Sequence, residues 1–150
     1  TALPPGTATT GGGRWGLGRL YTLGLVPLFL ATPFFARATF RREVVPGRVW
    51  SFEQKQGIGL GLNTSLNVRM TVLRLSEGGL FVYGPVAPTR ECVELLREVE
   101  RETGEEVALV LLPTTLLEHK QFLAPFASRF PRARVLVAPG QYGWPVPNVG

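Results

Sequence analysis

The sequence lacks the residues on which most catalytic centres depend. Its 150 residues include no Asp, one His (His119) and one Cys (Cys92). A single Cys cannot form an intrachain disulfide or a zinc finger. One His without Asp excludes a Ser-His-Asp triad and a metal centre built from His and Asp. Charged residues are also few, at 18% of the chain, whereas the 45% that are hydrophobic leave enough apolar surface for one packed core.

The net charge of +5 is concentrated in the first third of the chain. Residues 1–50 carry six Arg and one Glu, whereas residues 51–150 carry ten basic and ten acidic side chains. The basic residues flank an apolar segment, and no aromatic residues alternate with them along a strand or helix. This pattern argues against nucleic-acid binding and favours a membrane surface or a membrane complex as the partner.

Residues 20–36 form an uncharged apolar run between Arg19 and Arg37. As a helix this run would reach only about 25 Å, short of the ~30 Å hydrocarbon core, and Pro27 and Pro33 would kink or end it. We expect a short, broken segment that contacts a membrane or a membrane protein. The alternatives are an arm packed on its own domain and a remnant of an organelle-targeting sequence. The residues expected to contact the membrane or a partner are Trp15, Arg19, Tyr21, Leu25, Phe29, Phe34, Phe35, Arg37, Arg41 and Arg42.

Residues 1–47 are therefore interpreted as a basic, hydrophobic arm of low complexity, and residues 48–150 as an α/β domain. A helix is predicted to begin after Thr89, a favourable N-cap, and to end at Gly104. A second helix is predicted near His119, burying Phe122 and Phe126. The first helix is predicted to bury a stripe formed by Cys92, Leu95, Leu96 and Val99, which lie at i, i+3, i+4 and i+7.

The strands of this domain are predicted from β-branched and apolar runs. A short strand is expected at residues 49–53, followed by a Gly-rich loop at residues 57–62 that does not fit a phosphate-binding motif. The strands predicted to share one sheet are Val68–Leu75, Leu80–Tyr83, Val107–Leu112 and Val135–Ala138. The last two are predicted to be buried strands, and the uninterrupted VALVLL run is typical of burial on both faces. The predicted order is hairpin, helix, strand, helix, strand.

Several sequence blocks of this domain stand in a familiar order, among them Val49–Gln54, Gly78–Tyr83, Pro85–Thr89, Leu112–Thr115 and Val137–Gln141. Together they resemble a family of chloroplast and cyanobacterial proteins, a domain of unknown function related to the metallo-β-lactamase fold. The resemblance covers about residues 48 to 145. It implies a partial metallo-β-lactamase-like αβ sandwich layer and a plastid location, and it implies no established activity.

The resemblance also allows the metal chemistry of the parent fold to be compared with this sequence. Metallo-β-lactamase-like hydrolases carry H-x-H-x-D-H after a buried strand, and the corresponding positions here are Thr114, Leu116, Glu118 and His119. Only His119 keeps its type, and catalytic zinc sites use three protein ligands. We therefore expect a vestigial motif, with no metal, no cofactor held by the chain's own ligands and no catalytic residue.

The sequence thus favours a non-catalytic accessory subunit of a chloroplast thylakoid membrane assembly, with a photosystem and its antenna as the candidate. Its expected partners are subunits of the membrane complex and lipid, with contact to neighbouring pigment, and not nucleic acid. The alternative is a soluble metallo-β-lactamase-like hydrolase relative whose active site is lost or incomplete.

Overall fold

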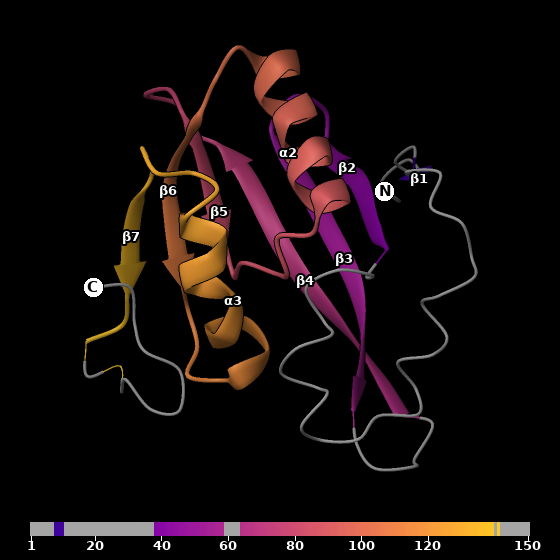
Figure 1. Cartoon of the computed structure of the whole chain (residues 1–150). Coiled ribbons are helices and arrows are strands. Elements are labelled where there is room, and N and C mark those ends of the chain that lie inside the picture. Colours follow the sequence, from indigo (N-terminus) through magenta and orange to yellow (C-terminus); the bar gives the residue numbers. More distant parts are fainter. Residues whose placement is uncertain (1–7, 11–37, 59–63, 140, 142–150) are drawn as a thin grey trace, which may run out of the picture.

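A computed structural model describes residues 8–10, 38–58, 64–139 and 141 of the chain. Within these residues the strands form one sheet in chain order, from β1 to β7. Neighbouring strands are antiparallel from β1 to β5, whereas β5, β6 and β7 run parallel (Figure 1). The strands are β1 (Ala8–Thr10), β2 (Thr39–Val45), β3 (Val49–Ile58), β4 (Thr64–Arg74), β5 (Leu80–Tyr83), β6 (Val107–Leu112) and β7 (Arg134–Val137).

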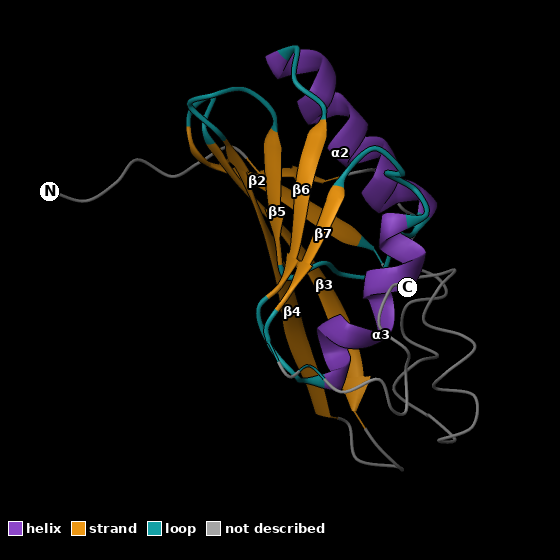
Figure 2. Cartoon of the chain, turned by 90° about the vertical axis from the view of Figure 1, so that its left-hand side faces the viewer, coloured by secondary structure: helices purple, strands orange, loops and turns teal. Residues whose placement is uncertain are grey.

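Two helices, α2 (Arg90–Thr103) and α3 (Leu117–Ala127), pack on the same face of this sheet. Figure 2 shows both on one side of the strands, with α2 over the antiparallel part and α3 beside the parallel part. Helix α2 connects β5 to β6, and α3 connects β6 to β7. The two strands of each pair are neighbours in the sheet, as short connections in α/β folds require. The predicted α/β class and the predicted order of elements after β3 are therefore confirmed.

The first helix begins and ends where the sequence predicted. The Thr89 side chain accepts a hydrogen bond from the backbone N–H of Cys92 at 3.1 Å, which satisfies one of the free donors of the first turn. Gly104 ends the helix with a φ of 70°, in the left-handed region that glycine adopts without strain. The predicted stripe of four residues is buried and faces the sheet.

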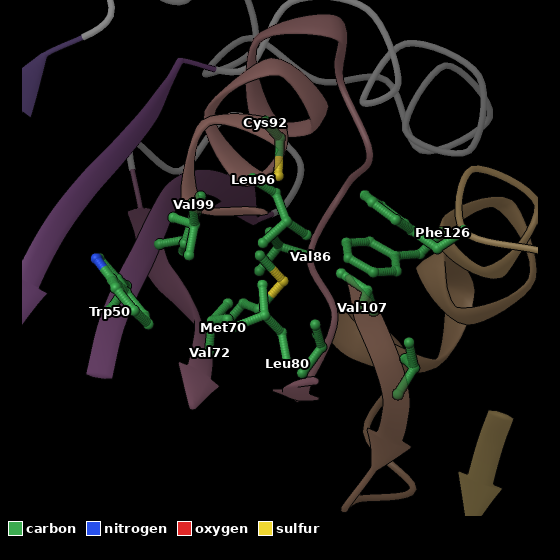
Figure 3. Close-up of a cluster of buried hydrophobic side chains, with 14 of the residues drawn as sticks. Trp50, Met70, Val72, Leu80, Val86, Cys92, Leu96, Val99, Val107 and Phe126 are labelled. Atoms are coloured by element: carbon green, nitrogen blue, oxygen red, sulfur yellow. The ribbon is translucent and has the colours of Figure 1, made fainter. Parts of the chain in front are cut away.

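The core lies between the helices and the sheet. Figure 3 shows Leu96 and Val99 of α2 and Phe126 of α3 directed toward the side chains of the central strands. Phe122 and Phe126 are both fully buried, as predicted. Beyond α3, the Phe126 ring stacks on Phe130 with 5.1 Å between centroids. The strand residues of this core are Trp50, Phe52, Val68, Met70, Val72, Leu80, Val82, Val107, Val110 and Leu112.

Sequence reasoning did not predict β2, and the predicted division at residue 47 leaves this strand on the arm side. Thr39–Val45 pairs antiparallel with β3, with one irregularity between Glu43 and Val45. Its sequence, TFRREVV, lacks the apolar and polar alternation of a half-buried strand, because the positions that face the helices include Arg41. That residue is nevertheless buried, since acidic side chains of α2 lie within ion-pairing distance of it.

The prediction that the two C-terminal strands are fully buried was wrong. In β6, Val107, Val110 and Leu112 are buried, but Ala108, Leu109 and Leu111 are only partly so. In β7, three of the four residues are exposed. The reason is topological: both helices lie on one face, so the opposite face of these strands has no described layer over it, and β7 stands at the sheet edge.

Candidate functional site

The predicted vestigial motif lies where the two parallel strands β5 and β6 end. Residues 84–89 follow β5 and residues 113–116 follow β6, and the carboxyl ends of adjacent parallel strands meet at one edge of a sheet, the usual place for ligands in α/β folds. His119, in the first turn of α3, spans the two loops. Its Nδ1 atom lies 3.0 Å from the carbonyl oxygen of Pro85.

Gly84 makes this close approach possible. It has a φ of 66°, and a Cβ atom placed on it would lie 3.3 Å from His119 Cε1. The imidazole therefore packs against a stretch of backbone that has no side chain. Glycine fits here for two reasons at once, its left-handed conformation and the space that the ring occupies.

Of the other motif positions, Thr114 also makes contacts within the chain. The Thr114 hydroxyl accepts a hydrogen bond from the Leu116 N–H at 3.1 Å, and the Thr114 carbonyl accepts one from Gln141 Nε2 at 3.0 Å. Leu116 stands before α3 with 60% of its surface exposed. Glu118 is half-buried in the first turn of α3. These contacts join the loop after β6 to the segment that follows β7.

The described residues contain no group of three or more His, Cys, Asp or Glu side chains placed to hold one metal ion. Cys92 is buried in the α2 stripe, and burial raises the pKa of its thiol to about 12, partly offset by a hydrogen bond with Thr39. A thiol with a raised pKa stays protonated at neutral pH, and Cys92 packs in the core as a small apolar side chain.

A buried polar cluster beside this edge was missed by sequence reasoning. Gln54 Nε2 donates to the Ala87 carbonyl at 2.8 Å and to the Thr39 hydroxyl at 3.0 Å. The Thr39 N–H donates to a carboxylate oxygen of Glu91 at 2.7 Å. The cluster fastens the loop after β5 and the start of α2 to β2 and β3. Nothing in the sequence marks Gln54 as buried, since one Gln in a strand is usually exposed.

The contact residues predicted in the arm fall into two groups. Two lie in β2, on opposite faces. Arg41 is buried under α2, with Nη1 2.9 Å from Glu102 and 3.3 Å from Glu98, so its guanidinium already has protein partners. Arg42 is exposed on the other face. The residues from Trp15 to Arg37 lie outside the described residues, so their role stays a prediction. Neither α2 nor α3 is long and apolar enough to cross a membrane.

Comparison with known proteins gives the family and no activity. No curated protein sequence matches the chain. Residues 46–149 match a family described as a domain of unknown function, DUF4336. This match covers most of the chain, including the strands from β3 to β7, both helices and the edge described above. The chain therefore belongs to the DUF4336 family.

Proposed function

We propose that this chain is a non-catalytic subunit of a membrane-associated protein assembly, which it joins through residues 1–37. The observation that carries the proposal is that polar groups at the carboxyl ends of β5 and β6 contact other parts of this chain. His119 is held by the Pro85 carbonyl, and Thr114 by its own loop and by Gln141. These contacts fix the two loops. Because a His ring with Nδ1 on a carbonyl keeps its Nε2 for another partner, the support lies in the neighbouring motif positions, where Thr114, Leu116 and Glu118 stand in place of metal-binding His and Asp.

The sequence of the arm supplies the second support. The uncharged run at residues 20–36 is bordered by Arg19 and Arg37, and residues 1–37 contain no acidic side chain. Burying each large apolar side chain of such a run stabilises binding by ~1.5–3 kcal/mol. Each Arg near an anionic surface adds about 1 kcal/mol. Placement at the thylakoid, in a photosystem with its antenna and beside neighbouring pigment and lipid, belongs to this proposal and rests on the family resemblance alone.

The test is cell fractionation of the intact chain and of a variant lacking residues 1–37. We expect the intact chain in the membrane fraction and the truncated chain in the soluble fraction, because the truncation removes the apolar run. A matched control keeps the length and the arginines but replaces Leu25, Phe29, Phe34 and Phe35 by Ser, and it should behave like the truncation. Equal membrane retention of all three would contradict the proposal. Near-stoichiometric zinc or iron in the purified chain would instead favour the hydrolase alternative.

A further inference from the structure

The strand β1 connects the arm to the folded body at a second point. Ala8–Thr10 pairs antiparallel with β2, with Ala8 opposite Arg42 and Thr10 opposite Phe40. The Cα atoms of residues that lie opposite each other in an antiparallel pair are about 4.5–5.5 Å apart. The chain therefore leaves β1 and re-enters the sheet at β2 at one place on the sheet edge, and the uncharged run at residues 20–36 lies between these two points in the sequence.

The strand that receives β1 is fixed to the rest of the body. The backbone N–H of Thr39 donates to the carboxylate of Glu91 at 2.7 Å, and Arg41 Nη1 lies 2.9 Å from Glu102 of α2. On its other side, β2 pairs with β3. As long as β1 stays paired with β2, both ends of the chain between these two strands are therefore held at the same edge of the body.

This pairing is incompatible with a single crossing of a bilayer by the apolar run. One crossing would place the start of the run on the far side of the bilayer, so residues 11–19 would have to cross the hydrocarbon core as well. These nine residues, GGGRWGLGR, include five Gly and two Arg. Fully extended they reach about 30–32 Å, which only just equals the core thickness, and their backbone polar groups and Arg14 would lie unpaired in hydrocarbon.

The charges on the two sides of the run favour the same surface. Arg14 and Arg19 precede the run, Arg37 and Arg42 follow it, and no acidic residue occurs before Glu43. A crossing segment is oriented by an excess of Lys and Arg on one side of it, and this run has Arg on both. Arg residues near an anionic surface are attracted to it. Both ends of the run are therefore expected at the same layer of anionic headgroups.

We propose that the chain contacts a bilayer from one side only, with β1 still paired to β2. The apolar side chains of residues 20–36 then enter the leaflet that faces the body, and the flanking Arg residues stay among its anionic headgroups. The partner surface is thus one anionic leaflet, and both ends of the run remain on the side of the folded body. This inference rests on the proposed function, because it specifies how the arm meets a membrane.

The test is a disulfide that locks β1 onto β2 in the full chain. Ala8→Cys combined with Arg42→Cys places two thiols on paired residues, at a separation that a disulfide can bridge. Cys92 is buried and stays out of the reaction. The chain is bound to phosphatidylglycerol–phosphatidylcholine vesicles and then oxidised; flotation measures binding, and a non-reducing gel measures cross-linking. Ala8→Cys with Val44→Cys is the matched control, because Val44 lies outside the residues that pair with β1.

We expect the same cross-linking yield on vesicles as in solution, and vesicle binding of the cross-linked chain within about twofold of the reduced chain. Cross-linking that fails on vesicles, or binding that falls at least about tenfold once the disulfide forms, would overturn the inference, because β1 would then have to leave β2 at the membrane. Equal cross-linking of the control pair would overturn it too, since β1 would then have no fixed register.

Two further outcomes are separated from these. If the first pair does not cross-link in solution, Thr10→Cys with Phe40→Cys repeats the test at the other end of the pairing, and failure of both pairs overturns the inference. A reduced chain that does not bind vesicles also overturns it and assigns the contact of the arm to protein. The proposed function is judged separately, by the fractionation of the chain that lacks residues 1–37.

Discussion

Gly84 and Gly47 share one backbone conformation but have different surroundings. Their φ angles are 66° and 64°, so a Cβ atom is unfavourable at both positions. At Gly47 nothing lies within 4 Å of that Cβ atom, whereas at Gly84 it would press on the His119 ring. The pair therefore separates the cost of the left-handed conformation from the cost of displacing the imidazole.

We predict that Gly47→Ala lowers the free energy of unfolding by about 1–2 kcal/mol, the cost of a left-handed residue that has a Cβ. Gly84→Ala should cost at least ~1 kcal/mol more, since His119 must shift and loses its contact with Pro85. Urea denaturation of the two variants measures the difference. Equal losses would show that the ring moves freely and that the His119–Pro85 contact does not hold the two loops together.

Individual elements differ in how well the sequence predicts them. The helix α2 was predicted in full because every local requirement agrees: Thr89 as cap, a 3.6-residue apolar period and a terminal Gly104. For β6, the run VALVLL showed that a strand forms but not how many layers cover it, since burial depends on where other elements pack. For β2, the deciding partner of Arg41 lies 57 residues further along the chain, beyond the reach of local patterns.

At the sheet edge formed by the loops after β5 and β6, the sequence likewise predicted the elements but not the contacts between them. The sequence placed Thr114 to His119 after a strand and at the start of a helix, and the structure agrees. It could not show that His119 reaches the Pro85 carbonyl, because that contact depends on how β5 and β6 lie side by side. The exposure of the sheet face opposite the helices was missed for a related reason: apolar residues on both sides of a strand favour a core, and only the topology shows which face the helices cover.

The packing of α2 yields a prediction at the scale of one element. Leu96 is fully buried against the sheet, so Leu96→Ala removes apolar contacts and leaves a cavity. We expect the free energy of unfolding to fall by ~2–5 kcal/mol. Leu116→Ala is the control, since it shortens an exposed Leu and should change stability by less than ~0.5 kcal/mol. If Leu96→Ala lowered the free energy of unfolding as little as the control does, the packing of α2 on the sheet would contribute little to the stability of the core.

At the scale of the whole molecule, the chain combines a nearly neutral folded body with a basic, apolar arm. The three Arg of residues 1–37 account for most of the net charge of +5. In the body, α2 and α3 pack on one face of the sheet, and no described element covers the opposite face. The proposed function therefore assigns membrane contact to the arm, whereas the folded body forms a separately packed α/β domain.

The boundary between arm and body is itself testable by two truncations. Removing residues 1–37 leaves β2 intact, whereas removing residues 1–47 also deletes β2, with Thr39 and Arg41 and their contacts to Gln54, Glu91, Glu98 and Glu102. Loss of β2 exposes one side of β3, including the surface of Trp50 and Phe52, and leaves the carboxylates of α2 without their buried Arg. We therefore expect the shorter truncation to retain a cooperative thermal transition and the longer one to lose it or to melt at a much lower temperature. Calorimetry of the two purified proteins provides the measurement. Similar melting temperatures would place β2 with the arm and return the boundary to residue 47.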